Sequence, residues 1–489
     1  MSQTESTADY SALLKRCDEL IRAGKFSSVT ALLSGLTLAQ VPRTHRQSLA
    51  KVCRRAGLIS MGLRLLHPVI HSDKPLLDPA TAGEICEYAV LLSRIGSISE
   101  ALELLSKVSP VEAPEALLYQ GFCHISMWEY KTANGYLEQY LAQPLEPYAK
   151  LVSSVNLASG YLMTKQFDAA ETLLNSCIET ATSLNSQRLV GNCLELRGRM
   201  QILRGDFAKA RLDLDRASGI FGQAQSYDQL LIAKWHALMA ATEHGSASPL
   251  LEFRKEAFQR QHWESVRDAD LFSLKIEFDS ARFDYLYYGT PLAAYRARIG
   301  EEVAHTPNPE FIFGESTGRC VDLATGELDG GEALQGGRMV HKVIGALIRD
   351  FYVPRNIGSL FSELYPGEYF DIASSPLRVR QLLSRTRKWA SENQVPLTIE
   401  QNKGSYRLSL GEGFGIRMSM AAAPLEPSQA QWSKLKNVFP IGREFKIQEA
   451  CERLGCSKSG FHRLSAWAIE NGSLLRTGEG KATRYRRAG

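Results

Sequence analysis

Apolar residues recur at helical spacing through the first 300 residues, and a short phrase of residue types repeats with them. A glycine or polar turn precedes an aromatic residue or isoleucine; a small residue and then a leucine follow at fixed distances, as in Phe167, Ala170 and Leu174. The residue after the turn lies at positions 26, 59, 98, 130, 167 and 207, at intervals of 32 to 40 residues. Such periods predict pairs of antiparallel helices, in which small residues permit close approach and the residue after the turn fills the gap between units.

This phrase resembles the tetratricopeptide repeat (TPR) family over about residues 8–300, with degenerate copies. Segments 230–242, 250–260 and 263–288 lack the phrase but keep amphipathic helical spacing, so we expect them to cap the stack. The resemblance implies an α-solenoid whose concave groove holds a protein, a peptide or a partner helix. A scaffold or dimerisation surface is an equal alternative, and a homodimer is left open.

The last third of the chain changes to short strands and helices. Segments 311–314 and 318–323 predict a hairpin, followed by a polar, glycine-rich connection at 326–337. Further elements are predicted in the order helix, helix, helix, strand, strand, at 338–350, 357–365, 378–393, 396–399 and 405–408. This is the plan of a winged helix, in which the third helix enters the major groove and the final hairpin reaches the adjacent backbone.

The third helix and the wing of that plan carry a recognisable pattern: Leu383, Arg385, Arg387 and Lys388, then Ile399, then the run from Lys403 to Leu408. This pattern resembles the effector domain of OmpR/PhoB-type bacterial transcription regulators, over about 310–410. Thr386 and Ser405 depart from that pattern, which usually has leucine and glycine there. The resemblance implies that a basic set contacts DNA from the third helix and the wing: Arg378, Arg385, Arg387, Lys388, Lys403 and Arg407.

A second signature follows a Gly/Pro/Ala linker at 411–429. Ala450, Gly455, Ser457 and Phe461 have helix-turn-helix spacing, in which Gly455 takes the turn and Ser457 caps the second helix. Two strands around a glycine-rich basic tip then predict a wing. The segment 430–489 resembles the winged helix-turn-helix of many bacterial regulators. The resemblance implies that residues early on the second helix face the DNA groove: Lys458, Ser459, His462 and Arg463. It also implies that basic residues of the wing contact phosphates: Lys481, Arg484, Arg486 and Arg487.

Charge divides along the same line. Residues 338–489 contain 24 Lys and Arg against 13 Asp and Glu, a net charge of +11. The totals of 57 and 53 leave 33 basic and 40 acidic residues, a net charge of −7, for residues 1–337. A basic end on a mildly acidic body favours a polyanionic partner at that end.

The remaining composition indicates an intracellular protein. Nine cysteines are scattered without a C-x-x-C pair, which is typical of small buried residues in a reducing compartment. The first residues lack a signal-peptide pattern, and no apolar run approaches the roughly 20 residues that span a bilayer. We therefore expect a cytoplasmic location without membrane insertion.

Sequence motifs for catalysis are not found. The chain has no P-loop, H-E-x-x-H or G-x-S-x-G motif, and His462 has no second ligand at metal-binding spacing. We therefore expect no enzyme activity, no cofactor and no metal. The predicted fold is mostly α: a TPR-like solenoid (8–300) followed by two small α+β winged helices (310–410 and 430–489).

These predictions favour a transcription regulator that binds double-stranded DNA and receives its signal through the solenoid. The alternative is a scaffold or assembly subunit that uses the same modules for protein contacts. Concentration of Lys and Arg on the wings and third helices favours DNA, as does the avidity of two linked weak sites.

Overall fold

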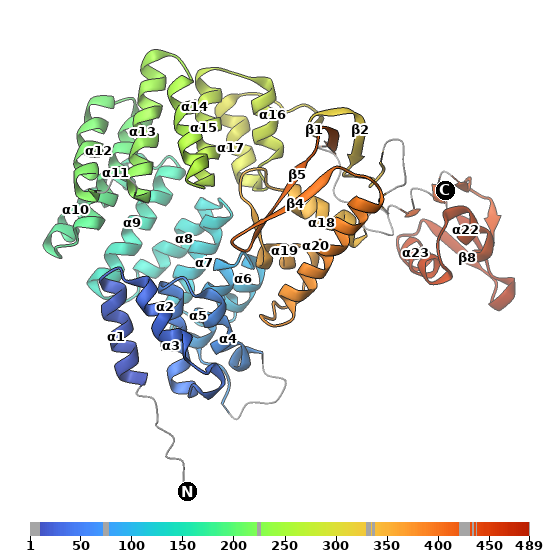
Figure 1. Cartoon of the computed structure of the whole chain (residues 1–489), viewed down its shortest axis with the longest axis horizontal. Helices are drawn as coiled ribbons and strands as arrows, with labels where there is room; N and C mark the ends of the chain where they lie inside the picture. Colours follow the sequence, from blue (N-terminus) through green and yellow to red (C-terminus); the bar gives the residue numbers. More distant parts are fainter. Residues whose placement is uncertain are drawn as a thin grey trace, which may run out of the picture. The chain divides into compact units, whose positions relative to one another are not determined.

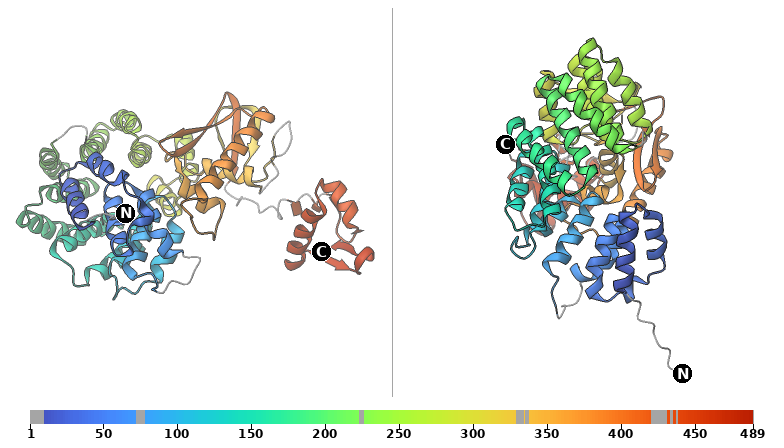
Figure 2. Two further views of the ribbon diagram at one scale, coloured as in Figure 1. Left: turned by 60° about the horizontal axis from the view of Figure 1, so that its bottom comes forward. Right: turned by 90° about the vertical axis from the view of Figure 1, so that its left-hand side faces the viewer.

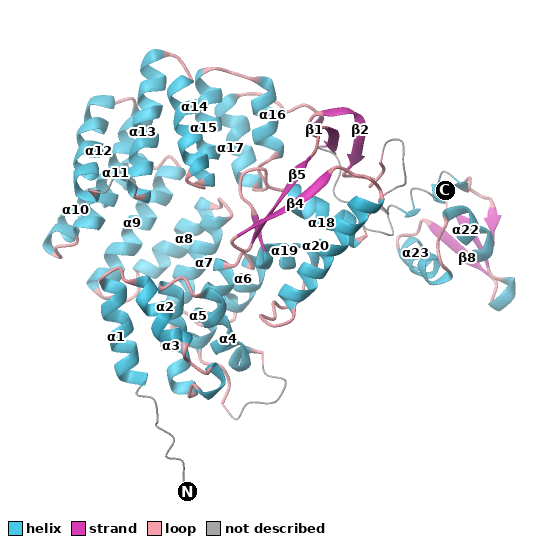
Figure 3. Ribbon diagram, in the orientation of Figure 1, coloured by secondary structure: helices cyan, strands magenta, loops and turns pink. Residues whose placement is uncertain are grey.

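The computed structural model describes residues 10–71, 78–222, 226–328, 334, 338–419, 431–432, 435–436 and 438–488. The chain divides into two compact units. The first contains Met1–Thr306 and Asn356–Arg378, and the second contains Pro307–Arg355 and Val379–Gly489. Helices dominate the N-terminal part, and strands appear among the described residues only after residue 309 (Figures 1 and 3).

Helices of the first unit follow one another through short turns and pack against their sequence neighbours. They are α1 (Tyr10–Arg22), α2 (Phe26–Ser34), α3 (Arg43–Arg55), α4 (Ile59–Ile70), α5 (Ala82–Arg94), α6 (Ile98–Ser106), α7 (Glu115–Ser126), α8 (Tyr130–Leu141), α9 (Pro147–Met163), α10 (Phe167–Ser183), α11 (Gln187–Arg204), α12 (Phe207–Phe221), α13 (Tyr227–His244), α14 (Ser248–Gln259), α15 (Trp263–Ile276), α16 (Ser280–Tyr288) and α17 (Ala293–Val303). In the left view of Figure 2 these helices follow one another around a ring. The N-terminal part is thus a helical-repeat solenoid.

The repeat phrase locates the helices correctly. Its six turn residues are the first residues of α2, α4, α6, α8, α10 and α12. Their expected role as gap-filling core residues is wrong, because Phe167 and Phe207 are only partly buried and Phe26 is 47% exposed. The first residue of a helix lies at the end of the hairpin, whereas the positions three and seven residues later face the partner helix.

The small residues of the phrase do permit close approach. Ala170, Leu174, Ala210 and Leu214 are completely buried. A Cβ atom added to Gly198 would lie 2.8 Å from the Cγ atom of Leu214, so α11 and α12 approach as closely as they do only because residue 198 has no side chain. The segment expected to be helical over 263–288 is divided between α15 and α16, and Asp279 caps the second helix by accepting the backbone N–H of Arg282 at 2.7 Å.

A charged and aromatic cluster joins non-adjacent helices inside the solenoid. The rings of Trp128, just before α8, and Tyr295, in α17, lie 4.3 Å apart between centroids. Lys234 pairs with Asp268 at 2.8 Å, and the Tyr295 hydroxyl donates to the same carboxylate at 3.2 Å. Burial alone would raise the pKa of Asp268, but Lys234 and Arg298 outweigh it and lower the pKa to about 2. The cluster therefore stabilises the solenoid as a set of paired charges.

Between the repeats and the C-terminus lies a segment of mixed structure, residues 310–419, called here the middle segment. Its elements are β1 (Glu310–Phe313), β2 (Ser316–Asp322), α18 (Met339–Ile348), β3 (Arg355–Asn356), α19 (Ile357–Leu364), α20 (Ser375–Glu392), β4 (Leu397–Asn402), β5 (Ser405–Leu410) and β6 (Gly413–Ser419). The three helices and the β4–β5 hairpin lie where the sequence predicts them. The strands form two sheets, with the orders β1-β6-β2 and β3-β5-β4.

Two expectations about this segment are wrong. Strands β1 and β2 do not pair as a hairpin, because β6 lies between them, antiparallel to β1 and parallel to β2. The expected linker at 411–429 therefore contains the strand β6, whose Phe414 and Ile416 are completely buried. Residues 420–429 of that linker lie outside the described residues, as does most of the connection at 326–337. Strands β1 and β2 are neighbours in the sequence and therefore predict a hairpin, but β6, about 90 residues later, takes the position between them, and local sequence carries no signal for that pairing.

The C-terminal module, residues 431–488, has its own small core. It contains β7 (Glu444–Phe445), α22 (Ile447–Leu454), α23 (Lys458–Glu470), β8 (Leu474–Thr477) and β9 (Arg484–Arg487), and its strands are ordered β7-β9-β8. Phe445, Phe461 and Tyr485 bring β7, α23 and β9 together, with ring centroids of Phe461 and Tyr485 5.0 Å apart. The fold is thus mostly helical with small α+β parts near the C-terminus, as predicted.

Candidate nucleic-acid interface

Helix α23 is fixed in the C-terminal module by its first turn and its apolar face. Gly455 adopts a φ of +60°, which ends α22 in the left-handed region. The Ser457 hydroxyl accepts the backbone N–H of Gly460 at 3.1 Å and caps α23. Phe461 and Leu464 are completely buried on the core side of the helix. These local features orient α23 and determine which of its side chains face solvent.

The solvent-facing side of α23 is polar and basic at its N-terminal end. Lys458, Ser459, His462 and Arg463 are all exposed. Their spacing places them on consecutive turns of one face, opposite Phe461 and Leu464. The structure thus brings together all four residues that the sequence assigns to this helix, on a surface that a partner can reach.

The β8–β9 hairpin presents a different mixture of arginines. Arg486 is exposed, and Arg484 is partly exposed and donates to nearby backbone carbonyls. Arg487 instead donates to the carbonyl oxygens of Lys436 and Phe439 at 2.9 and 2.8 Å. Arg487 therefore ties β9 to the start of the module, which the sequence does not show. The Lys481 side chain lies outside the described part of the chain.

Arg476 is a basic residue that the sequence analysis did not select. It lies on β8 opposite Tyr485 and is exposed. Alternation along the strand places Arg476 on the same face as the buried Leu474, two residues earlier, so alternation does not account for its exposure.

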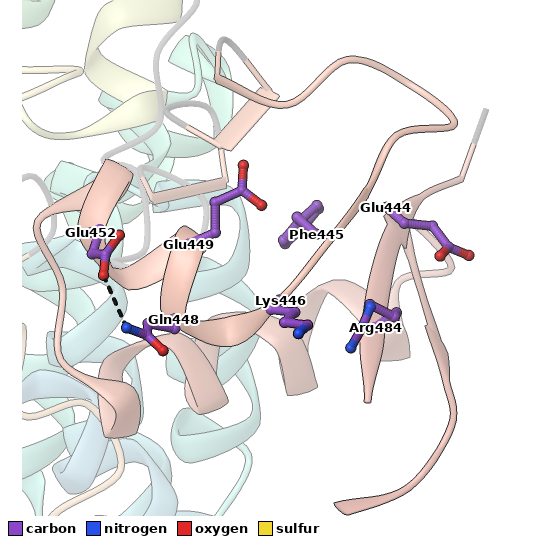
Figure 4. A pocket seen from close by; sticks show the side chains of 7 residues that line it. All are labelled: Glu444, Phe445, Lys446, Gln448, Glu449, Glu452 and Arg484. Carbon is purple, nitrogen blue, oxygen red and sulfur yellow. Dashed lines mark hydrogen bonds between the residues drawn. The ribbon is translucent and has the colours of Figure 1, made fainter. Parts of the chain in front are cut away.

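A shallow hollow lies beside β7, α22 and β9, with a volume of about 380 Å³ (Figure 4). It is lined by three carboxylates, two basic residues, one amide and one aromatic residue: Glu444, Glu449, Glu452, Lys446, Arg484, Gln448 and Phe445. Gln448 donates to Glu452, one turn later on α22, at 3.2 Å. Because carboxylates predominate, the hollow does not favour a phosphate.

Helix α20 exposes a second basic face. Arg385, Arg387 and Lys388 are exposed, and Arg380, which the sequence analysis did not select, lies on the same side about two turns earlier. Arg387 also donates to the Ile399 carbonyl at 2.9 Å. Arg378 differs: it pairs with Glu368, and its guanidinium lies 3.9 Å from the centre of the Tyr365 ring.

The β4–β5 hairpin likewise separates two basic residues. Lys403 and Gly404 form its tip with φ values of +47° and +83°, and Lys403 is exposed. Arg407 is partly buried and donates to the Tyr352 carbonyl at 2.5 Å. Arg407 and Arg487 therefore bond within the fold, and a guanidinium that already donates to backbone carbonyls has less capacity for an external phosphate. Arg378 instead pairs with Glu368 at the surface, where its side chain is 39% exposed.

Among the described residues, no group of three or more His, Cys, Asp and Glu side chains is placed to hold a metal ion. None of the described helices combines the length and apolar character needed to cross a membrane.

No protein-family model and no curated protein matches the sequence. Among solved structures, the chain is similar to a tetratricopeptide repeat protein from Parabacteroides merdae, with 16% identity, 46% of this chain and 97% of that chain covered, and a TM-score of 0.26. It is also similar to aspartyl phosphate phosphatase F from Bacillus subtilis, with 14% identity, 62% and 90% coverage, and a TM-score of 0.35. No function passes to this chain from likenesses of this size.

Proposed function

We propose that this chain is a DNA-binding transcription regulator. In this proposal the C-terminal module and the middle segment act as winged helices on duplex DNA. The helical-repeat solenoid receives the signal by binding a protein or peptide. The observation that carries the proposal is the exposed polar and basic face of α23, formed by Lys458, Ser459, His462 and Arg463.

The physical basis is the match between this face and a DNA groove. A helix fits the major groove, where arginine can donate two hydrogen bonds to guanine and smaller polar residues read other base edges. Residues 431–489 contain 12 basic and 5 acidic residues, a net charge of +7, which supplies attraction to phosphates. The exposed Arg486 on the neighbouring hairpin is available for backbone contact.

The test uses the full chain and a pool of random duplexes, from which a preferred site is selected. Arg463→Ala is expected to weaken binding to that site by about 1–3 kcal/mol and to leave binding to random DNA nearly unchanged. The matched control is Arg443→Ala, because Arg443 is exposed in the same module but pairs with Glu449 of α22 and lies over the Phe439 ring. Arg443→Ala should change neither affinity by more than a fewfold.

Two results would contradict parts of this proposal. If the full chain shifts no duplex at about 50 mM salt, where nonspecific binding is strongest, the DNA proposal is wrong. The alternative of a scaffold or assembly subunit would then be preferred. Equal losses on both kinds of DNA for Arg463→Ala would assign that residue to phosphate contact.

A further inference from the structure

Part of the middle segment packs on the helical repeats inside the first compact unit. Residues 357–375, called here the corner, comprise α19 and the connection to α20. The surface that receives them, called here the socket, is formed by residues of α4, α5 and α6 and the turn between α5 and α6. The sequence pattern places the corner in a separate domain and gives no sign of this contact.

Two glycines allow the backbones to meet. A Cβ atom added to Gly358, in α19, would lie 2.2 Å from the carbonyl oxygen of Ile95. A Cβ atom added to Gly96, where φ is +86°, would lie 2.8 Å from the Cβ atom of Ser359. No larger residue fits at position 358 without moving the turn before α6, so the fit is specific to this pair of segments.

The contact includes a buried carboxylate. Glu100, in α6, is only 7% exposed, and one of its carboxylate oxygens accepts the backbone N–H of Phe370 at 2.9 Å and the Ser97 hydroxyl at 3.1 Å. The hydroxyls of Ser97 and Ser362 are 2.9 Å apart. A buried carboxylate of the repeats is thus satisfied in part by the backbone of the corner.

Two histidines complete the socket. His67 lies between the Tyr88 hydroxyl, 2.9 Å from Nδ1, and the carboxylate of Asp371, 3.0 Å from Nε2. The ring of His71 contacts that of Tyr369, with centroids 4.9 Å apart. The contact therefore includes several hydrogen-bonding groups, which can be hydrated when the two surfaces separate.

The corner leads directly into the helix proposed to bind DNA. Helix α20 begins at Ser375, and its first residues belong to the same unit as the repeats. Residues 1–306, which contain the repeats, hold 32 basic and 34 acidic residues, a net charge of −2, so the repeats do not repel a polyanion through their net charge. While the corner occupies the socket, the first turn of α20 stays in the same compact unit as the repeats, which restricts access of a duplex to that end of the helix.

We propose that the corner and the socket form a releasable latch that restrains DNA binding until the corner leaves the socket. This inference rests on the proposed function for its effect on DNA, but the latch itself is testable without DNA. A partner of the repeats that displaces the corner would act as an inducer. The latch would thereby connect the signal to α20.

The first experiment tests the contact in the full chain. A protease site is inserted between Thr306 and Pro307, in an exposed loop at the boundary between the units, and the purified protein is cut. The two pieces should stay together on size exclusion. Gly358→Ala should weaken their association about tenfold or more, because the added methyl group clashes with a backbone carbonyl.

The matched control is Gly345→Ala in α18, where an added Cβ atom meets nothing closer than 3.7 Å. Alanine favours both helices by itself, so a loss confined to Gly358→Ala reports the contact and not misfolding. Glu100→Gln, which keeps the size of the side chain, should also weaken the association. Pieces that separate without any substitution, or that stay equally bound with Gly358→Ala, would overturn the latch.

The second experiment measures duplex affinity of the uncut chain at about 50 mM salt. Gly358→Ala should bind about three- to tenfold more tightly than the unchanged chain, and Gly345→Ala should bind equally to it. Equal or weaker binding by Gly358→Ala would overturn restraint of DNA binding, even if the cutting experiment supports the contact. If no variant binds duplex, the proposed function fails, and the DNA role of the latch fails with it.

Discussion

Packing between α11 and α12 gives a sharp test of the repeat architecture. Leu214 is completely buried and faces Gly198, which offers no side-chain atoms of its own. Leu214→Ala therefore leaves a cavity that the opposite helix cannot fill. We expect a loss of about 3–5 kcal/mol in the stability of these repeats, in the upper part of the range for buried leucine.

The same geometry predicts rescue by a second substitution. Gly198→Ala alone places a methyl group 2.8 Å from the Leu214 Cγ atom, and this overpacking opposes the higher helix propensity of alanine. Once Leu214 is alanine, the nearest remaining atom is the Ala210 carbonyl oxygen, 3.4 Å away. Gly198→Ala should then recover about 2 kcal/mol, from helix propensity and one buried methyl group.

Hydrogen exchange of amides in α11 and α12 measures the local opening free energy of each variant. Leu212→Ala is the control, because Leu212 is 67% exposed on the same helix and its truncation should change little. The double variant should be more stable than Leu214→Ala alone. If the two losses simply add, residues 198 and 214 do not share a packing site, and the close approach of the two helices is not what the small residue provides.

Three further predictions concern arginine roles, acid stability and helix capping. Arg487→Met should lower the melting temperature of the C-terminal module, because it removes two hydrogen bonds to backbone carbonyls. Arg486→Met should leave the melting temperature unchanged but weaken DNA binding on all sequences, as gel shifts would show. Equal melting temperatures of the two variants would contradict this division of roles. The pKa of Asp268 is lowered from 3.8 to about 2, so its ionised carboxylate stabilises the fold fully above pH 4 and loses this effect as the pH falls through 2. In urea titrations, the stability advantage of the unchanged chain over Asp268→Asn should shrink by about 2 kcal/mol between pH 5 and pH 2. A constant difference would refute this prediction. Thr81→Ala should lower the stability of α5 by about 1 kcal/mol, because it removes the reciprocal cap between Thr81 and Glu84. Hydrogen exchange of the amides in the first turn of α5 should become faster. Unchanged exchange would refute the prediction.

Local patterns in the sequence determined the helices. The repeat phrase places the first residues of six helices, and Gly455 and Ser457 mark the turn and cap between α22 and α23. These signals are readable because the spacing of apolar residues, a glycine with positive φ and a capping hydroxyl act within a few residues. The exposed face of α23 follows from the same periodicity, so the four candidate residues on it could be named before the structure.

Tertiary structure decided what depends on partners far away in the chain. The strand β6 separates β1 from β2, the corner packs on the socket, and Arg407 and Arg487 donate to backbone carbonyls about 50 residues away in the chain. A glycine such as Gly358 looks like any other helical residue until Ile95 is placed against it. An arginine in a basic run likewise looks the same in the sequence whether its guanidinium faces solvent or a backbone carbonyl. Long-range packing determines which of the two it contacts, and the local spacing of residues carries no information about that packing.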